Sequence, residues 1–348
     1  MNRALSVRCS SLLAVSSFAI AIAAGTTASA DTFDLALQRL VLPPQNGGYA
    51  DPGSQANIDA GALIAYRQVV SELAAALAPG ILTTADTVGY SGFQFTADYS
   101  LTTISTDQAK CQVGVDPSLH KGDCPWNFAV EGGKNGAKLP GMLNTLTVMA
   151  RKGIWMPLPS FEIGAGASKL LQSNLFTVQV YAKFALHEGF HKWPIPSLAV
   201  RGSATRVMGE SQIDLTMAQL DVSISKSIGI AGTVTLVPYA GAAWLYAIPR
   251  GQVLDLTPDH DAFRDGPSSV DLNNNAVFPS SANADITRWR FFGGMRLNYN
   301  ILVLTADFIA TMCGDFNGGC AGDRHPTGKI ADNAATQYTF SASAGFLF

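Results

Sequence analysis

Hydrophobic and polar side chains alternate with a period of two over most of the chain after residue 88. In the first such segment, Phe93, Phe95, Ala97, Tyr99 and Leu101 alternate with polar neighbours. Successive side chains of a β-strand point to opposite faces, so this pattern predicts a strand with one apolar and one polar face. The same alternation recurs over 145–151, 161–168, 176–186, 198–205, 212–226, 234–246, 288–299, 302–308 and 337–348. The sequence therefore predicts about ten strands, within a range of eight to twelve.

The connections between these strands differ in length in a regular way. If the first strand runs outward, the long connections at 105–142, 248–285 and 313–335 all follow outward strands. The connections near 153–158, 227–232 and 298–300 are short, and the one at 187–196 is intermediate. Long outer loops and short inner turns are typical of a transmembrane β-barrel. The alternative is a soluble β-sandwich, which usually has shorter strands and a turn every 8–12 residues.

One predicted strand is irregular. Over 212–226 the apolar positions change phase between Met217 and Leu220. A β-bulge adds one residue to a strand and would produce this change of phase. The sequence therefore predicts a bulge near Ala218.

The segment 31–85 has a different pattern. Residues 31–42 have the pattern of a helix, which Pro43, Pro44 and a glycine-rich stretch would end. A second helix is predicted from residue 57 or 58 to Ala78, because apolar residues recur there at helical spacing at Ile58, Ala62, Tyr66, Val69, Leu73 and Leu77. Such a helix packs on the barrel, plugs its lumen or lies in the periplasm, and the sequence does not distinguish these arrangements.

The last strand carries Tyr338, Phe340, Phe346 and Phe348 on one face and ends the chain on an aromatic residue. This ending resembles the closing strand of bacterial outer-membrane β-barrels. The resemblance implies that these four aromatic residues form the assembly signal read by the barrel-assembly machinery. It also implies outer-membrane lipid as a partner, and it points to no narrower family.

The first thirty residues have the pattern of a secretory signal peptide. Arg3 and Arg8 precede an apolar run over 12–24, and Ala28-Ser29-Ala30 fits a cleavage site. The apolar run is too short to be a good membrane anchor. The predicted mature chain begins near Asp31 and has 348 − 30 = 318 residues. The predicted division is therefore a signal peptide at 1–30, a helical segment at 31–85 and a barrel at 86–348.

Composition agrees with an exported membrane barrel. Removing Arg3 and Arg8 from the 23 basic residues leaves 21 against 26 acidic residues, a net charge of −5. This balance gives no support for nucleic-acid binding. Only 14% of the residues are charged, against about 25% in soluble domains. The mature chain nevertheless has no apolar run long enough for a membrane helix.

Four cysteines remain after the predicted cleavage. We favour the disulfides Cys111–Cys124 and Cys313–Cys320, because each closes a short loop in an oxidising compartment. Other pairings stay open, since four cysteines allow three. A zinc site is disfavoured because the C-x-x-C spacing is missing.

One motif suggests chemistry. His187-Glu188-Gly189-Phe190-His191 fits H-E-x-x-H, in which two histidines bind zinc and the glutamate acts as general base. That motif needs a helix. The residues before it alternate with period two, and Pro194 and Pro196 follow it. A secreted zinc peptidase is therefore kept only as an alternative to a polar turn.

The polar faces of the predicted strands carry charges that we place in the lumen. These lumen-lining candidates are Asp98, Arg151, Glu162, Lys183, Arg201, Asp214, Asp221, Arg288, Arg290, Arg296 and Asp307. They could line a water path, or pair and seal it, and a barrel of about ten strands is narrow. Acidic residues in the loops 255–271 and 315–323 could bind calcium but fit solvated loops better.

The sequence thus predicts an all-β protein: a monomeric, antiparallel up-and-down outer-membrane β-barrel with a short helical N-terminal segment. Its expected role is a narrow passage for small solutes or a structural surface barrel. We predict no cofactor, no metal and no catalytic residues. A barrel enzyme acting on membrane lipids is the other alternative.

Overall fold

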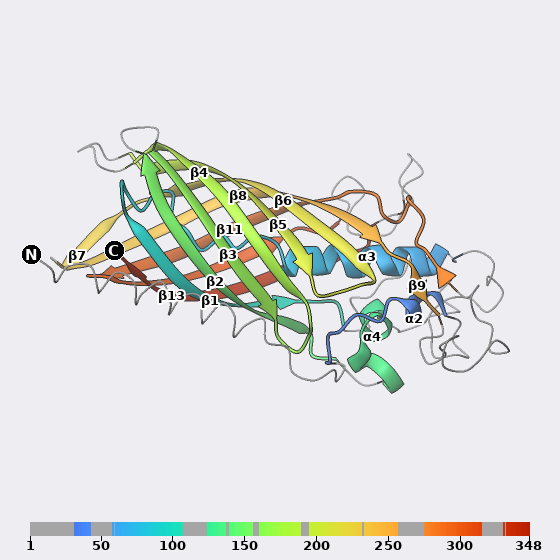
Figure 1. Cartoon of the computed structure of the whole chain (residues 1–348). Coiled ribbons are helices and arrows are strands. Elements are labelled where there is room, and N and C mark those ends of the chain that lie inside the picture. Colours follow the sequence, from blue (N-terminus) through green and yellow to red (C-terminus); the bar gives the residue numbers. More distant parts are fainter. Residues whose placement is uncertain are drawn as a thin grey trace, which may run out of the picture.

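The computed structural model describes residues 31–42, 58, 60–106, 124–136, 139–155, 160–188, 195–231, 233–256, 275–314, 330 and 332–348. Its main feature is an antiparallel barrel of ten strands (Figure 1). The strands are β1 (Phe93–Thr103), β2 (Met142–Trp155), β3 (Ser160–Leu170), β4 (Phe176–His187), β5 (Ser197–Met208), β6 (Ile213–Ser225), β8 (Val234–Gly251), β11 (Ile286–Tyr299), β12 (Leu302–Thr311) and β13 (Gln337–Leu347). The predicted all-β barrel of about ten strands is confirmed.

The barrel closes through its first and last strands. Each strand pairs with the next in this order, and β13 pairs with β1 from Gln94↔Leu347 to Thr102↔Thr339. At the end of this ladder, the Phe93 and Phe348 amides each donate to the other residue's carbonyl oxygen, at 2.9 and 2.8 Å. Closure leaves no open edge in the barrel.

The two ends of the barrel differ. We call the end with the connections 104–141, 252–285 and 312–336 the loop end, and it also carries two short turns at 171–175 and 209–212. We call the opposite end the turn end, where the connections 226–233 and 300–301 and residue 348 lie. Three short strands extend these connections: β7 (Ile228–Ala231), β9 (Leu254–Asp255) and β10 (Asn275–Ala276). The asymmetry agrees with the connection lengths predicted from the sequence.

Alternation along the strands separates an apolar outer face from an inner face. On the outer face, Val180, Trp289 and Phe340 are 53%, 46% and 51% exposed. The residues between them point inward and are buried, as in β13, where every second residue from Gln337 to Ser343 is buried. An apolar outer face suits contact with lipid rather than water. None of the described helices is both long and apolar enough to cross a bilayer.

The bulge predicted near Ala218 is wrong. Strand β6 pairs with β5 and β8 in continuous register through this position, and Ile213, Leu215 and Met217 point inward along with Gln219. The change of phase in the sequence comes from the inner face itself, which is apolar near the loop end and polar nearer the turn end. Register shifts occur instead at Gly153/Trp155, Ala185/His187 and Gly229/Ala231.

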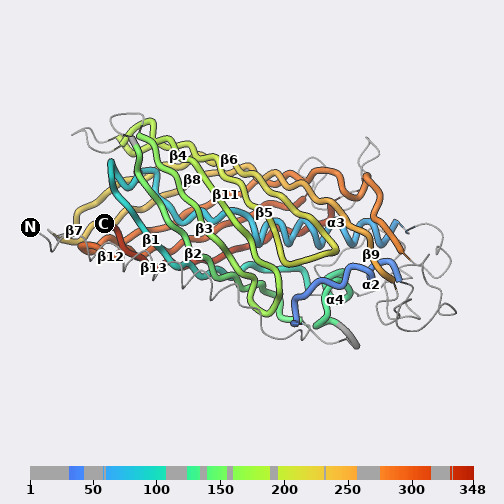
Figure 2. Tube along the Cα trace, viewed as in Figure 1, coloured from blue at the N-terminus to red at the C-terminus, as the bar shows by residue number. Residues whose placement is uncertain are grey.

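The N-terminal segment enters the lumen. The helix α3 (Ala60–Ala76) lies at the loop end, and from it the chain runs through the interior to the start of β1 at the turn end (Figure 2). We call residues 60–92 the plug and its non-helical part, 77–92, the threading stretch. Fourteen of the 17 residues of α3 are buried, because the barrel wall and segments at the loop end cover the helix together. The predicted helix over 57–78 is thus present, at 60–76.

The helix predicted over 31–42 is mostly wrong. Only α2 (Gln38–Val41) is helical there. Leu35 instead forms an isolated antiparallel bridge with Val130, next to α4 (Pro125–Ala129) and the 3-10 helix η2 (Glu131–Gly136). Backbone pairing with this loop overrides the local helical pattern. Residues 31–42 therefore lie at the loop end, beside α4 (Figure 1).

Candidate functional site: the occupied lumen

The threading stretch crosses the turn-end half of the lumen without a strand partner. A buried backbone needs hydrogen-bond partners, and an extended chain cannot supply its own. Residues 81–85 are all buried. The wall of the barrel must therefore satisfy the backbone of this stretch.

Cationic side chains of the wall donate to the carbonyl groups of the threading stretch. Arg201 Nη1 donates to Gly80 O at 2.9 Å, and Arg151 Nη2 donates to Leu82 O at 2.8 Å. Lys183 Nζ donates to Asp86 O at 2.8 Å and to Thr84 O at 3.3 Å, and Arg290 Nη1 donates to Pro79 O at 3.3 Å. Hydrogen bonds from ionised donors are stronger than neutral ones. Four cations thus hold five carbonyl groups of one short stretch.

Acceptors of the wall receive the amides of the same stretch. The Val88 amide donates to Glu162 Oε2 at 2.8 Å, and the Thr87 amide donates to Glu188 Oε1 at 2.7 Å. The amides of Gly80 and Ala85 donate to Gln179 Oε1 and Ser225 Oγ, at 3.2 Å each. The wall therefore binds both the carbonyl and the amide groups of the threading stretch.

Glu162 is the centre of this network. Its Oε1 accepts from Tyr181 Oη at 2.7 Å and lies 3.1 Å from Lys183 Nζ, while its Oε2 accepts from Val88. Glu162 and Lys183 are 0% and 1% exposed. A buried ion pair is stable only when further hydrogen bonds satisfy both partners, and here the plug supplies them.

Other lumen charges bind wall partners as well as the plug. Arg201 Nε donates to Asp221 Oδ2 at 2.9 Å, and the guanidinium stacks over the Tyr181 ring at 5.3 Å. Arg296 donates to Thr84 Oγ1 and to Gln94 Oε1, each at 3.0 Å. Asp98 and Asp307 accept from the wall hydroxyl groups of Ser343 and Tyr239. Each inner charge thus has a protein partner, in the plug or in the wall.

The loop-end half is built differently. Helix α3 packs into an apolar cluster with inward residues from many strands: Leu143, Leu170, Val207, Ile213, Leu215, Met217, Leu245, Ala247 and Ile286. Phe33, Leu35, Leu37 and Leu40 of the N-terminal segment join the same cluster. The helix satisfies its own backbone, so the wall around it can be apolar.

A few polar groups of α3 fix its position at the loop end. Glu72 Oε2 accepts from Trp126 Nε1 and from the Ser105 amide, both at 2.8 Å. Tyr66 Oη donates to Asn283 Oδ1 at 2.8 Å, and its ring stacks on Phe278 at 3.8 Å. These contacts tie the helix to two separate loops, 104–141 and 252–285.

Near the end of α3, Arg288 and Asp332 complete the polar contacts. Arg288 Nη1 donates to Ser71 O at 3.3 Å, and Ser71 Oγ donates to Asp332 Oδ2 at 2.6 Å. Burial raises the pKa of Asp332, while the nearby Arg288 and Arg67 act in the opposite direction.

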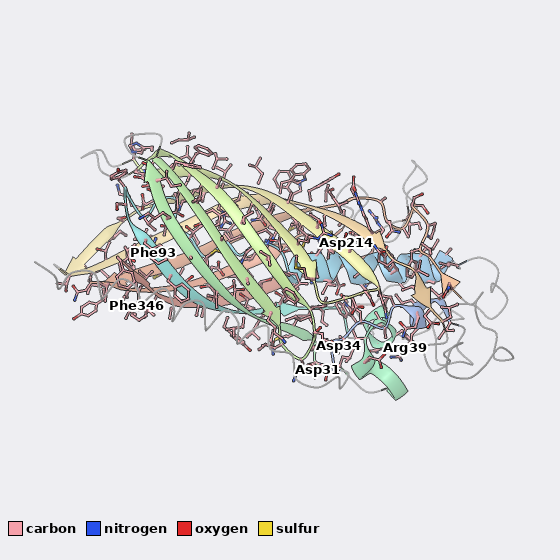
Figure 3. The ribbon with its side chains drawn as sticks, in the orientation of Figure 1. Asp31, Asp34, Arg39, Phe93, Asp214 and Phe346 are labelled. Carbon is pink, nitrogen blue, oxygen red and sulfur yellow. The ribbon has the colours of Figure 1, made fainter. Side chains whose placement is uncertain are left out.

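The start of the described chain binds the rim of the loop end. Asp34 accepts from the Asn174 amide at 2.6 Å, and the Leu37 amide donates to Gln212 Oε1 at 2.6 Å. Both partners belong to short loop-end turns. Figure 3 shows Asp31, Asp34 and Arg39 at this end, with Phe93 and Phe346 at the other.

Ten of the eleven lumen candidates are buried on the inner face. They comprise six cations, Arg151, Lys183, Arg201, Arg288, Arg290 and Arg296, and four carboxylates, Asp98, Glu162, Asp221 and Asp307. The prediction that Asp214 lines the lumen is wrong. Because β6 has no bulge, Asp214 keeps the outward phase, where it pairs with the exposed Arg206 at 2.9 Å.

The described part of the H-E-x-x-H motif is not helical. His187 ends strand β4, and Glu188 Oε1 accepts from both the amide and the hydroxyl of Thr87. Residues 189–191 lie outside the described part of the chain. This arrangement gives the peptidase alternative no support, because the described glutamate binds the plug. Among the described residues, no group of three or more His, Cys, Asp or Glu side chains is placed to hold a metal ion.

Two plug-binding residues were not singled out from the sequence. Gln179 and Ser225 lie among the inward polar residues but carry no charge. Glu188 was singled out only as part of the H-E-x-x-H motif, not as a residue that binds the plug. The only signal for the first two was their inward phase. That phase says which face a residue occupies but not what it binds.

The remaining predicted residues are only partly described. Cys124 and Cys313 are disulfide-bonded. Cys111 and Cys320 lie outside the described residues, so the two pairings stay predictions. The same holds for calcium binding in most of the two acidic loops. Tyr338, Phe340, Phe346 and Phe348 point outward and are 45–70% exposed, and their role in assembly stays a prediction.

No protein-family model matches the chain, and no curated protein matches it. Similar solved structures are bacterial outer-membrane β-barrels. They include Ail, the attachment invasion locus protein of Yersinia pestis, with 11% identity over 75% of this chain and 100% of that chain, and a TM-score of 0.25. The translocator domain of the autotransporter NalP from Neisseria meningitidis has 10% identity over 74% and 88%, with a TM-score of 0.34. Outer-membrane expressed OmpT of Vibrio cholerae has 8% identity over 75% and 99%, with a TM-score of 0.27. Likenesses this weak carry no argument about function.

Proposed function

We propose that this chain is a bacterial outer-membrane barrel that is closed by its own N-terminal segment and holds residues 31–42 at its cell-surface end, where Asp31 is exposed. The observation that carries the proposal is the plug, which fills the lumen and bonds to the wall along the threading stretch. A barrel with this lumen is a closed surface protein rather than a constitutive pore.

The apolar outer face supports the placement in a membrane. The strands of the barrel have ten or more residues, the length that a tilted membrane strand needs. In outer-membrane barrels the long loops face outside and the short turns face the periplasm. The loop end then faces outside, and Asp31 lies there, on the far side of the membrane from Phe93 (Figure 3).

Passage of solutes would require the plug to move. The chain continues directly from the threading stretch into β1, so the plug is tethered at the turn end. Any movement of the plug must also break the charge-assisted hydrogen bonds in the turn-end half of the lumen. We therefore favour a closed structural and display role over a narrow pore, and we assign no catalytic role to the described residues.

Cysteine labelling on intact cells tests this proposal. Asp31 and Lys226 are both exposed, at the loop end and the turn end respectively. The variant Asp31→Cys should react with a membrane-impermeant maleimide on intact cells. The matched variant Lys226→Cys should react only after the outer membrane is permeabilised.

Two results would contradict the proposal. Labelling of both positions only after permeabilisation would place the N-terminal segment on the periplasmic side of the membrane. A soluble protein without a mobility shift between unboiled and boiled samples would reject the membrane barrel itself.

The enzyme alternatives have their own test, which is lipid or peptide hydrolysis by the purified chain with Glu188→Ala as the control.

A further inference from the structure

The outer face of the barrel has a recess over β4, β5, β6 and β8. Its volume is about 660 Å³. Small outward residues form its floor: Ala182, Gly202, Ala204 and Ala218. Val180, Leu220, Trp244 and Tyr246 stand around it. The recess is therefore an apolar groove on a surface that we place against lipid.

Register shows that the groove is continuous. Gly202 pairs with Ala182 on one side and with Leu220 on the other, and Ala204 pairs with Ala218. Ala218 in turn pairs with Tyr246 on β8. Apart from Gly202 and its two neighbours in the chain, no described atom lies within 4 Å of where a Cβ on Gly202 would be, so none of the described side chains fills the floor. An open apolar groove of this kind fits a hydrocarbon chain, which gains from every contact with it.

Cations lie just beyond the groove, towards the loop end. Arg206 follows Ala204 on the same face of β5, about 7 Å further along the strand. Arg250 lies on the outer face of β8 and is exposed, as is Arg206. Lys169, on β3, is the only other outward-facing cation in the loop-end half of the described strands. Two carboxylates lie at the same level: Asp214 pairs with Arg206 at 2.9 Å, and Asp285 accepts from Tyr246 Oη. Arg250 and Lys169 form no ion pair with the described residues.

We propose that this groove is a binding site for a phosphate-bearing glycolipid of the outer leaflet, of the lipid A type. An acyl chain lies in the groove, and Arg206 and Arg250 bind a phosphate of the headgroup. Guanidinium groups pair well with phosphate, and the loop end is the level at which outer-leaflet headgroups lie. This inference rests on the membrane orientation proposed above.

Native mass spectrometry of the purified full-length chain in a non-ionic detergent tests the site. The probes are lipid A and the same lipid with its phosphates removed. Inorganic phosphate is added in a separate arm as a competitor. We expect the wild type to bind lipid A about 10- to 100-fold more tightly than the dephosphorylated lipid, the range for losing a hydrogen bond to a charged group. Inorganic phosphate should not displace lipid A, because it cannot fill the groove.

Two sets of variants separate the groove from the charges. Gly202→Leu fills the floor and should lower the affinity for both lipids about tenfold or more, whereas Gly229→Leu, at an equally open position outside the groove, should not. The double variant Arg206→Gln/Arg250→Gln should remove the preference for phosphate and retain binding of the acyl chains. Lys152→Gln, which changes an outward cation near the turn end, should leave the preference intact.

Equal affinity of the wild type for the two lipids, or unchanged binding by Gly202→Leu, would overturn the inference. Each variant must first show the mobility shift between unboiled and boiled samples, and Ala204→Leu replaces any Gly202 variant that does not. The outcome is separate from the proposed function. A chain that is labelled at Asp31→Cys on intact cells yet binds no lipid A refutes only this site.

Discussion

The two halves of the lumen surround the plug with different kinds of side chain. Near the loop end a helix lies against apolar residues such as Leu215 and Leu245, whereas near the turn end an extended stretch lies against Arg151, Lys183 and Glu162. The same strands build both halves, and β6 changes from Met217 to Gln219 within two residues. A helix satisfies its own backbone, while an extended chain depends on its surroundings. The conformation of the plug therefore dictates the chemistry of the wall at each level.

The comparison also explains how the charges of the turn-end half are used. Five buried wall cations and five buried wall carboxylates lie there: Arg151, Lys183, Arg201, Arg290 and Arg296, and Asp98, Glu162, Glu188, Asp221 and Asp307. The carbonyl and amide groups of the threading stretch bind several of these charges directly. The cluster of arginines on β11 thus serves the plug, not a path for anions.

The largest effect is expected from removing one charge of the turn-end network. Lys183→Met leaves Glu162 buried without its cation and removes the donor of two plug carbonyl groups. We expect it to lower the free energy of unfolding by about 3–5 kcal/mol. Denaturant unfolding in detergent measures this loss.

A double variant sharpens the same test. Lys183→Met/Glu162→Gln removes both charges, so it should cost less than the sum of the two single variants. Strict additivity would show that the pair does not act as a unit and would weaken the proposed role of the network.

In the loop-end half the expected cost comes from a cavity and not from charge. Leu73→Ala removes a side chain of α3 that is 1% exposed. We expect a loss of about 2–5 kcal/mol in the same measurement. The control is Leu186→Ala on the outer face, where the side chain is 52% exposed. Equal losses for the two variants would mean that α3 is not packed inside the barrel.

A smaller effect tests the polar contacts of α3. Tyr66→Phe removes the hydrogen bond to Asn283 and keeps the stacking on Phe278. A loss of about 0.5–1.5 kcal/mol is expected, since one hydrogen bond of this kind contributes that much. A loss several times larger would show that the hydroxyl group holds the whole loop in place.

The smallest effect is expected outside the lumen. Asp214→Asn breaks an exposed pair with Arg206, so we expect a loss of about 0.2–1 kcal/mol that added salt diminishes. A loss as large as that of Lys183→Met would put Asp214 back among the inner charges, where the sequence had suggested it.

The sequence predicted the wall and the helix α3 well and the threading stretch poorly. Alternation such as that of β13 depends only on which face meets lipid, and it therefore survives in the sequence. The threading stretch has no such pattern, because its partners bind backbone atoms that every residue carries. The helix predicted over 31–42 was wrong for a related reason, since the bridge between Leu35 and Val130 is made by the backbone.

One sequence signal for the plug was present but was interpreted wrongly. Ile213, Leu215 and Met217 are apolar in the inward phase of β6, and we attributed this to a bulge. With an unbroken register, the same residues indicate that an apolar segment of the chain fills the loop-end half of the lumen. The outward position of Asp214 follows from the same correction.

Conductance of the full-length chain in planar bilayers tests the central claim most directly. The account predicts that the inserted wild-type protein is silent, while a general porin in the same bilayer conducts. It also predicts current steps from Lys183→Met, in which the plug is bound less firmly. Stable open channels from the wild type would contradict a lumen that is closed by residues 60–92.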